Sequence, residues 1–203
     1  MVKEGIWFAA VPASLGAVCL GLGWTSLAAL AFLLAAFVLY FFRDPARVIP
    51  SEPGVIVSPA DGRVVEVSEP EMEGARKKKV SIFLSLFDVH VNRAPIGGII
   101  RKAEYRPGRF LVALRPEASR VNEQNVVTME GEGTAVTFAQ IAGVLARRIV
   151  FRKRPGDSLE RGERIGMIRF GSRVDVFLEP KCELAVKPGD RVQGGSSVLA
   201  RWQ

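Results

Sequence analysis

Residues 164–177 read RIGMIRFGSRVDVF, two short apolar runs that meet at the dipeptide Gly171-Ser172. Their β-branched and aromatic residues predict one strand over 164–170 and another over 173–177. A glycine that interrupts strands is typical of a β-bulge or of a close approach between backbones. A serine next to such a glycine can also attack the preceding carbonyl when a base lies near. The dipeptide therefore has both a structural and a chemical interpretation.

Short apolar segments of the same kind continue through most of the chain beyond residue 54, separated by turns such as Pro59-Ala60-Asp61-Gly62. We expect further strands at 55–57, 63–67, 79–87, 97–105, 110–114, 125–130, 134–141 and 147–151. Many short strands without a sustained helical period predict a mainly β domain, built as a sandwich or barrel. Ser58–Val67 and Val186–Ala200 resemble the strand–turn–strand units of biotinyl and lipoyl carrier domains, in shape only, because no carrier lysine stands at a tight turn.

The N-terminal part is different, because no charged residue occurs between Gly5 and Phe42. One spanning helix needs about 20 apolar residues, so two short helices that turn at Gly21-Leu22-Gly23 fit this stretch better than one. Its length, and the single basic residue Lys3 before it, argue against a cleaved signal peptide.

We therefore expect residues 1–42 to form a transmembrane helical hairpin that anchors a catalytic domain, residues 43–203, to the cell membrane. Lys3 precedes the first helix and Arg43 follows the second, which predicts that both ends, and the domain, lie on the cytoplasmic side. A re-entrant or interfacial pair of helices stays open, because each is near the lower length limit for a span.

The chain is basic, with 28 Lys and Arg against 21 Asp and Glu and a net charge of +7. A basic domain beside a membrane attracts anionic lipid, at roughly 1 kcal/mol for each cation near the surface. The basic runs at 76–79, 147–148 and 152–154 are either solvated faces or contacts to headgroups. Nucleic acid is the usual alternative partner, but no nucleic-acid-binding motif is present and none is expected to bind.

His90 is the only histidine in the chain, which excludes a histidine-rich zinc site, and no metal is expected. Positions 88, 90 and 92 lie on one face if this segment is a strand, so Asp88 could fix the tautomer of His90. The same residues are equally typical of a hydrogen-bonded structural histidine. Asp61 lies in an ordinary turn sequence, which by itself indicates only a turn.

Taken together, these segments resemble the phosphatidylserine decarboxylase family, in its short, membrane-bound, archaeal-type form. The matching motifs, in order, are FRDP (42–45), SPADG (58–62), FLSLFDVHVNRAP (83–95), YRPG (105–108), NEQN (122–125), QIAG (140–143), ARRI (146–149) and GMIRFGSRVDV (166–176). The resemblance covers nearly all of residues 42–203.

The resemblance implies a proenzyme that cleaves itself between Gly171 and Ser172 into a β chain, 1–171, and an α chain, 172–203. These chains are expected to stay together as a heterodimer or in a higher oligomer. Ser172 is expected to become a covalent pyruvoyl cofactor, which binds the amine of phosphatidylserine and accepts the electrons left when carbon dioxide departs. The product is phosphatidylethanolamine, a step in phospholipid biosynthesis.

The resemblance also assigns catalytic roles to Ser172, His90, Asp61 and Asp88. His90, oriented by Asp61 or Asp88, is expected to deprotonate Ser172 and later to act as a general acid. Longer members carry a second histidine where this chain has Arg93, so every histidine role falls to His90. Two alternatives stay open, a pyruvoyl decarboxylase for a soluble amino acid and a membrane-anchored adaptor without catalysis.

Overall fold

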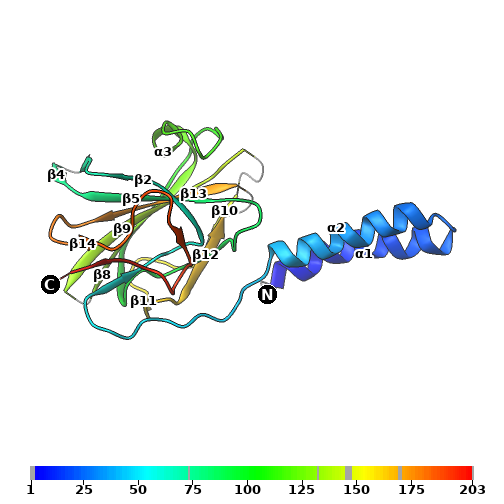
Figure 1. Ribbon diagram of the computed structural model, residues 1–203, viewed down its shortest axis with the longest axis horizontal. Coiled ribbons are helices and arrows are strands. Elements are labelled where there is room, and N and C mark those ends of the chain that lie inside the picture. The colour runs from blue at the N-terminus through cyan, green and yellow to red at the C-terminus, as the bar shows by residue number, and fades with distance from the viewer. Residues whose placement is uncertain (1–2, 73, 132, 145–147, 169–170, 203) are drawn as a thin grey trace. The chain divides into compact units, whose positions relative to one another are not determined.

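The computed structural model describes residues 3–72, 74–131, 133–144, 148–168 and 171–202 (Figure 1). The chain divides into two compact units, Met1–Ala46 and Arg47–Gln203. The first unit is helical, and the second is built mainly of strands.

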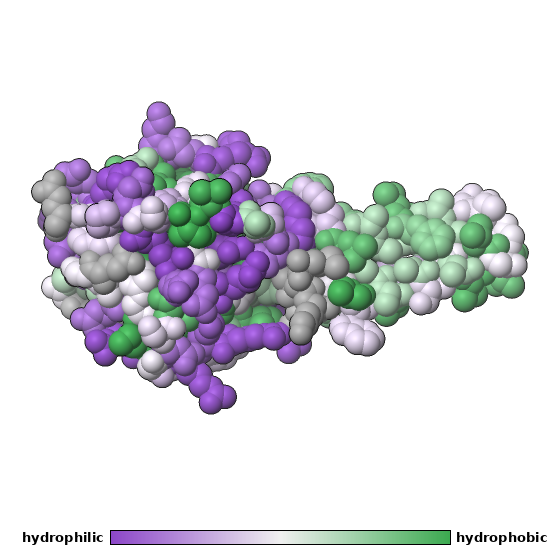
Figure 2. Space-filling view, turned by 90° about the horizontal axis from the view of Figure 1, so that it is seen from below, coloured by the Kyte–Doolittle hydropathy of each residue, from purple (hydrophilic) through white to green (hydrophobic). Residues whose placement is uncertain are grey.

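The helical unit is a pair of helices, α1 (Lys3–Gly21) and α2 (Thr25–Phe41), joined by a turn in which Gly23 has φ +79°. Glycine suits this position because other residues rarely adopt the left-handed conformation. The small side chains Ala28, Ala31 and Ala35 are the buried positions within α2, together with Phe41. Large apolar side chains such as Leu30 and Leu33 are exposed, and Figure 2 shows the apolar surface that results.

The predicted transmembrane character of this hairpin is not supported, although the two helices and the turn near Gly21–Gly23 do form. In the described part of the chain, no helix is long and apolar enough to cross a membrane. The helix α2 has 17 residues. At 1.5 Å per residue such a helix rises about 26 Å, which is less than the roughly 30 Å of a hydrocarbon core.

The second unit, within the described residues, contains one short helix, α3, and sixteen strands. Their bounds are β1 (Val55–Val57), β2 (Gly62–Ser68), β3 (Glu71–Met72), β4 (Ala75–Arg76), β5 (Lys78–Leu84), β6 (Val91–Arg93), β7 (Gly98–Arg106), α3 (Ala118–Val121), β8 (Gln124–Gly131), β9 (Thr134–Ile141), β10 (Ile149–Phe151), β11 (Ser158–Leu159), β12 (Arg164–Ile168), β13 (Ser172–Leu178), β14 (Glu183–Leu184), β15 (Arg191–Val192) and β16 (Val198–Arg201).

The largest sheet has eight strands in the order β11-β7-β8-β9-β13-β5-β2-β15. Its strand β13 lies in the interior of the sheet, antiparallel to β9 on one side and to β5 on the other. Smaller sheets, β1-β16-β14 and β10-β12-β6, complete the unit with the hairpin β3-β4. Residues such as Ile82, Phe138 and Val174 form one buried apolar core.

The prediction of a mainly β domain is therefore confirmed, whereas closure into a sandwich or barrel and the likeness to carrier domains stay predictions. The strand predicted at 110–114 is wrong, because this segment is a loop. The side chain of Asn122 binds both the N–H and the C=O of Leu111, at 2.9 and 2.8 Å, in place of a neighbouring strand. Arg147, Arg169 and Phe170, which belong to predicted strands, lie outside the described residues.

Candidate active site

Gly171 and Ser172 lie at the start of β13. Gly171 has φ +60°, a conformation that favours glycine, and Ser172 is the first residue of the strand, paired with Leu84 of β5. The Ser172 side chain is completely buried. Its Oγ has no hydrogen-bond partner among the residues that the structure describes. A buried hydroxyl without a partner is energetically unfavourable, which makes this serine a candidate for a chemical role.

Alternation along β13 decides which groups Ser172 can meet. Directly opposed residues share a face of a sheet, so Ser172 lies on the same face as Leu84, and on the same face as Val174 two residues along its own strand. Leu84 and Val174 both belong to the buried core. Ser172 therefore faces the interior of the domain, whereas Arg173 faces the other side of the sheet.

His90 is fully buried and lies between the end of β5 and the start of β6. Its Nδ1 lies 2.9 Å from the main-chain oxygen of Asp88. A carbonyl oxygen can only accept, so Nδ1 carries the hydrogen, and in the neutral ring Nε2 is then the basic nitrogen. The N–H of Ile168, at the end of β12, donates to the main-chain oxygen of His90 at 3.3 Å. His90 is thereby held close in the fold to the segment that leads into Gly171.

The Asp88 carboxylate, in contrast, stabilises a turn. Its Oδ2 accepts hydrogen bonds from the N–H and the Oγ of Ser85, at 2.8 and 2.6 Å, and its Oδ1 lies 3.7 Å from Arg191 Nη1. The expectation that positions 88, 90 and 92 share the face of one strand is wrong, because the Ser85–Asp88 turn interrupts the strand and β6 begins only at Val91. Asp88 contacts the His90 ring through its backbone.

Asp61 is held by a group that the sequence did not single out for this role, Arg47. Nη2 of Arg47 lies 2.7 Å from Oδ2 and 2.9 Å from Oδ1 of Asp61, and the N–H of Gly194 donates to Oδ1 at 2.9 Å. Burial raises the pKa of Asp61, the Asp88 charge adds to this, and the bonds from Gly194 and Arg47 reduce the effect without cancelling it. A raised pKa makes a carboxyl group better suited to exchange a proton near neutral pH.

A chain of three buried amides connects the site to the central sheet. Asn92 Nδ2 donates to the Pro59 oxygen at 3.4 Å, Gln140 Nε2 to Asn92 Oδ1 at 2.8 Å, and Asn125 Nδ2 to Gln140 Oε1 at 3.0 Å. Gln140 pairs with Val174, so it lies on the same inner face as Ser172. In the sequence, the sign of these amide hydrogen bonds was Gln140, a polar residue at an inward position of the predicted strand 134–141.

Arg93 is the residue that the resemblance placed where longer family members carry a second histidine. Its side chain is nearly buried, and Nη1 donates to the main-chain oxygen of Gly162 at 3.1 Å. The predicted basic run at 76–79 is also partly internal, because Lys78 Nζ binds the Cys182 oxygen at 2.8 Å and Lys79 Nζ lies 3.2 Å from Glu66 Oε1. These lysines are therefore engaged within the domain.

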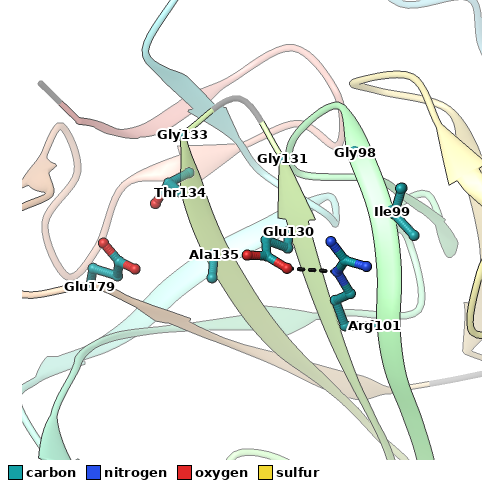
Figure 3. Close-up of a pocket in the computed structure, with 9 residues that line it drawn as sticks. All are labelled: Gly98, Ile99, Arg101, Glu130, Gly131, Gly133, Thr134, Ala135 and Glu179. Atoms are coloured by element: carbon teal, nitrogen blue, oxygen red, sulfur yellow. Dashed lines mark hydrogen bonds and ion pairs between the residues drawn. The ribbon is translucent and has the colours of Figure 1, made fainter.

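The hollow of Figure 3, about 590 Å³, lies at the other end of the sheet. Most of its lining comes from the start of β7, the end of β8 and the start of β9, where Thr134 pairs with Gly131. It contains the exposed ion pair between Arg101 and Glu130, whose charged atoms are 2.6 Å apart. Ser172 adjoins the opposite end of β9, because its neighbour Arg173 pairs with Ile141. The hollow is therefore separate from the candidate site.

The fold and the site define a class, a mainly β protein in which a Gly–Ser peptide bond at the start of a central strand occurs together with a buried histidine and a largely buried carboxyl group. A family model described as phosphatidylserine decarboxylase matches residues 34–200. A phosphatidylserine decarboxylase proenzyme from Solibacter usitatus is 54% identical over 201 residues, covering 99% of this chain and 96% of that protein. One from Symbiobacterium thermophilum is 47% identical over 205 residues, covering 99% and 95%. The chain belongs to the phosphatidylserine decarboxylase family.

Proposed function

We propose that this chain is a proenzyme that cleaves its own Gly171–Ser172 bond and then decarboxylates phosphatidylserine to phosphatidylethanolamine. The observation that carries the proposal is the Ser172 hydroxyl. It is buried, has no hydrogen-bond partner within the described residues, and follows a glycine at φ +60°. Ile168, a few residues before that glycine, binds the main chain of His90. The family membership supports both the cleavage and the substrate.

In the cleavage, the Oγ of Ser172 attacks the Gly171 carbonyl carbon and an ester replaces the peptide bond. The basic nitrogen of His90, set by the Nδ1–H bond to the Asp88 oxygen, takes the hydroxyl proton. Loss of the Ser172 α-proton then breaks the ester Cβ–O bond and frees Gly171 as a carboxylate. The dehydroalanine left at position 172 takes up water and releases ammonia, which leaves a pyruvoyl group.

The buried position of residue 172 fits a covalent carbonyl cofactor, because the core excludes water that would compete with the substrate amine. When present, the pyruvoyl group supplies the electron sink for loss of carbon dioxide. His90 is the group that we expect to return a proton to the substrate, and Asp61, with its raised pKa, is the carboxyl group that we expect to share in proton transfer.

The two product chains are expected to stay associated. Residues 172–203 contain β13, which pairs with β5 and β9 of the larger chain, and β16, which pairs with β1. The smaller chain thus supplies β13 and β15 to the eight-stranded sheet, and β14 and β16 to the sheet β1-β16-β14. The remaining strands of both sheets come from the larger chain. This pairing supports a heterodimer of the two chains.

An anionic membrane surface is the proposed partner, because both substrate and product are lipids. The exposed leucines of α1 and α2 suit a hairpin that inserts at the interface, with the catalytic domain on the cytoplasmic side. On the second unit, one loop exposes the side chains of Val112, Leu114 and Arg115. The side chain of Asn122 binds this loop to the main-chain oxygen of Ala142, next to the end of β9 where Ile141 pairs with Arg173. Apolar tips with a basic residue suit contact with anionic headgroups.

The cleavage is tested by the intact mass of the purified protein. The 203-residue wild type is expected to give a chain of 171 residues and a chain of the remaining 32. The smaller chain should be blocked at its N-terminus. Ser172→Ala is expected to stay as one chain. Ser119→Ala is the matched control, because Ser119 Oγ is also buried without a hydrogen-bond partner in the described part of the chain, and this variant should cleave normally. A single intact wild-type chain with full activity would overturn the proposal.

The substrate is tested with vesicles that contain phosphatidylserine and, separately, with free serine. Phosphatidylethanolamine and carbon dioxide are expected from the vesicles alone. Turnover of free serine at a similar kcat/KM would favour a decarboxylase for soluble amino acids. Absence of turnover in a cleaved, folded protein would remove phosphatidylserine as the substrate.

Membrane attachment is tested by sedimentation with anionic vesicles. Leu33→Gln, at a side chain that is 68% exposed in α2, should weaken binding. Val48→Gln is the control, because Val48 is 88% exposed but lies outside the helices. Equal binding by both variants would contradict a role for the hairpin.

A further inference from the structure

Arg173, the residue after the cleavage site, is buried in a network of charges. Its side chain is 2% exposed although it carries a guanidinium group. Nε donates to Asp175 Oδ1 at 2.7 Å, and Nη2 donates to Glu66 Oε2 at 2.6 Å and to Ser81 Oγ at 2.7 Å. Register explains the meeting, because Asp175 pairs with Ser81, and Ser81 pairs with Glu66, which places all of them on one face of the sheet.

A second cation completes the network. Lys79 Nζ lies 3.2 Å from Glu66 Oε1 and 3.5 Å from Asp175 Oδ2, so two cations face two carboxylates. Burial by itself would raise the pKa of Glu66, but hydrogen bonds from Ser68 and Arg173 and the Lys79 charge outweigh it, and the pKa is lowered. Buried charges are retained only when they are paired, so removal of Arg173 leaves carboxylates without their main partner.

The members of the network come from both sides of the scissile bond. Arg173 and Asp175 belong to residues 172–203, whereas Glu66, Ser81 and Lys79 belong to residues 1–171. Once the bond before residue 172 is broken, residue 172 is a chain end, and chain ends fray unless other contacts hold them. Arg173 is the nearest side chain along β13 that binds the larger chain through charged groups.

We propose that Arg173 is a positioning residue that holds residue 172 in its strand register after cleavage, by tying the new chain end to Glu66 and Ser81. This inference rests on the proposed self-cleavage and adds to it a role for the opposite face of β13. Before cleavage the covalent bond to Gly171 shares this task, so the demand on Arg173 is greatest in the cleaved enzyme. Arg173 does not touch the reacting atoms, because its side chain points away from the face of Ser172.

The test compares Arg173→Met in two backgrounds, the cleaved enzyme and the uncleaved Ser172→Ala protein. Hydrogen exchange by mass spectrometry is measured for a peptide that covers residues 172–178. In the cleaved enzyme, Arg173→Met should raise exchange of this peptide by about tenfold or more, and in the Ser172→Ala background the rise should be several times smaller. Arg101→Met is the control, because Arg101 forms an exposed ion pair with Glu130 on the same sheet and should change exchange in neither background.

Kinetics on phosphatidylserine vesicles give a second readout. In cleaved Arg173→Met, kcat should fall by about ten- to a hundredfold with little change in KM, because the reacting group is misplaced while lipid contacts remain. Arg173→Lys should restore part of kcat, since it keeps the charge near Asp175. Where Arg173→Met does not fold, Glu66→Gln is measured instead, because it weakens the link between chains and leaves the Arg173–Asp175 pair.

Equal increases in exchange in the two backgrounds would make Arg173 an ordinary core residue and overturn the inference. Wild-type exchange and kcat in Glu66→Gln and in Arg173→Met would do the same. A wild-type protein that stays as one chain would instead overturn the proposed cleavage, and with it this inference. The mass of the wild type therefore separates the two failures.

Discussion

Arg47 Nη2 lies within 2.9 Å of both carboxylate oxygens of Asp61, and both side chains are largely buried, at 8% and 13% exposure. The pair brings the connector before β1 into the site. Because burial alone raises the pKa of Asp61, the guanidinium is the main charge that keeps this carboxyl group available in its ionised form. Arg47 therefore acts together with the Gly194 N–H to lower the pKa that burial alone would give Asp61.

Arg47→Met is expected to raise the pKa of Asp61 further and to slow cleavage at neutral pH by about tenfold or more, because the ionised fraction falls. The sign is specific, since a carboxyl group with a higher pKa needs a higher pH to ionise, so the variant should regain cleavage rate as pH rises. The measurement is the cleavage rate against pH by intact mass. Identical pH profiles for wild type and variant would show that Asp61 ionisation is not involved.

The contact between His90 and the backbone of Asp88 predicts a contrast between their side chains. His90→Asn keeps a donor near the Asp88 oxygen but removes the base, so cleavage should slow by about 10²–10⁴ while the protein still folds. Asp88→Asn keeps that main-chain oxygen, so its effect should be within about tenfold, the cost of a weakened Ser85 turn. Cleavage time courses and thermal unfolding of both variants decide the point. Equal losses in the two variants would give the Asp88 carboxylate a direct role.

The buried amide chain predicts a stability effect. Gln140→Met has a similar volume but leaves Asn92 Oδ1 and Asn125 Nδ2 without the partners they have now, which should destabilise the domain by about 2–4 kcal/mol. Thr137→Val on the same strand is the control, because it loses only the half-buried bond to Thr128 and should cost about 1 kcal/mol or less. Urea unfolding measures both free energies. A change under 1 kcal/mol for Gln140→Met would mean that the hydrogen bonds between these buried amides add no net stability.

Much of this site could be predicted from local patterns, and the rest could not, because it depends on pairing between distant segments. The apolar residues around Gly171-Ser172 were sufficient to predict a strand on each side of this dipeptide. The contact between Arg47 and Asp61 could not be predicted, since nothing local indicates that two residues 14 positions apart meet. Asn92 and Gln140 are 48 residues apart and lie in two different sheets, and only the packing of these sheets brings their amides together.

The error at positions 88–92 has a different cause. A shared face at alternate positions requires a continuous strand, but a polar side chain can bind the backbone a few residues away and end the strand. Ser85 and Asp88 do so here, at the end of β5. Such competition is visible in a sequence only as a pair of polar residues three apart, which is common in strands and turns alike.

The lowered pKa of Glu66 predicts an acid sensitivity. Its folded pKa lies below the ordinary value of 4.5, so the unfolded chain binds more protons in acid. The stabilisation is therefore complete above about pH 4.5 and is lost as pH falls through the folded value. Glu66→Gln should lower stability at pH 7 and flatten its decline below pH 4.5, as measured by urea unfolding from pH 7 to pH 3. A decline as steep as in the wild type would assign the acid sensitivity to other carboxyl groups.

Gly171→Ala should separate backbone conformation from space at the cleavage site. At φ +60°, an added Cβ meets nothing within 4 Å among the described residues, so the substitution is opposed only by the left-handed backbone. That conformation costs an L-residue about 1–2 kcal/mol, so the variant should fold and should cleave about 5- to 30-fold more slowly. Gly62→Ala is the contrasting variant, because its Cβ would press against the main-chain oxygen of Phe83, and it should lose far more stability. Cleavage of Gly171→Ala at the wild-type rate would show that the left-handed conformation is not needed for attack by Ser172.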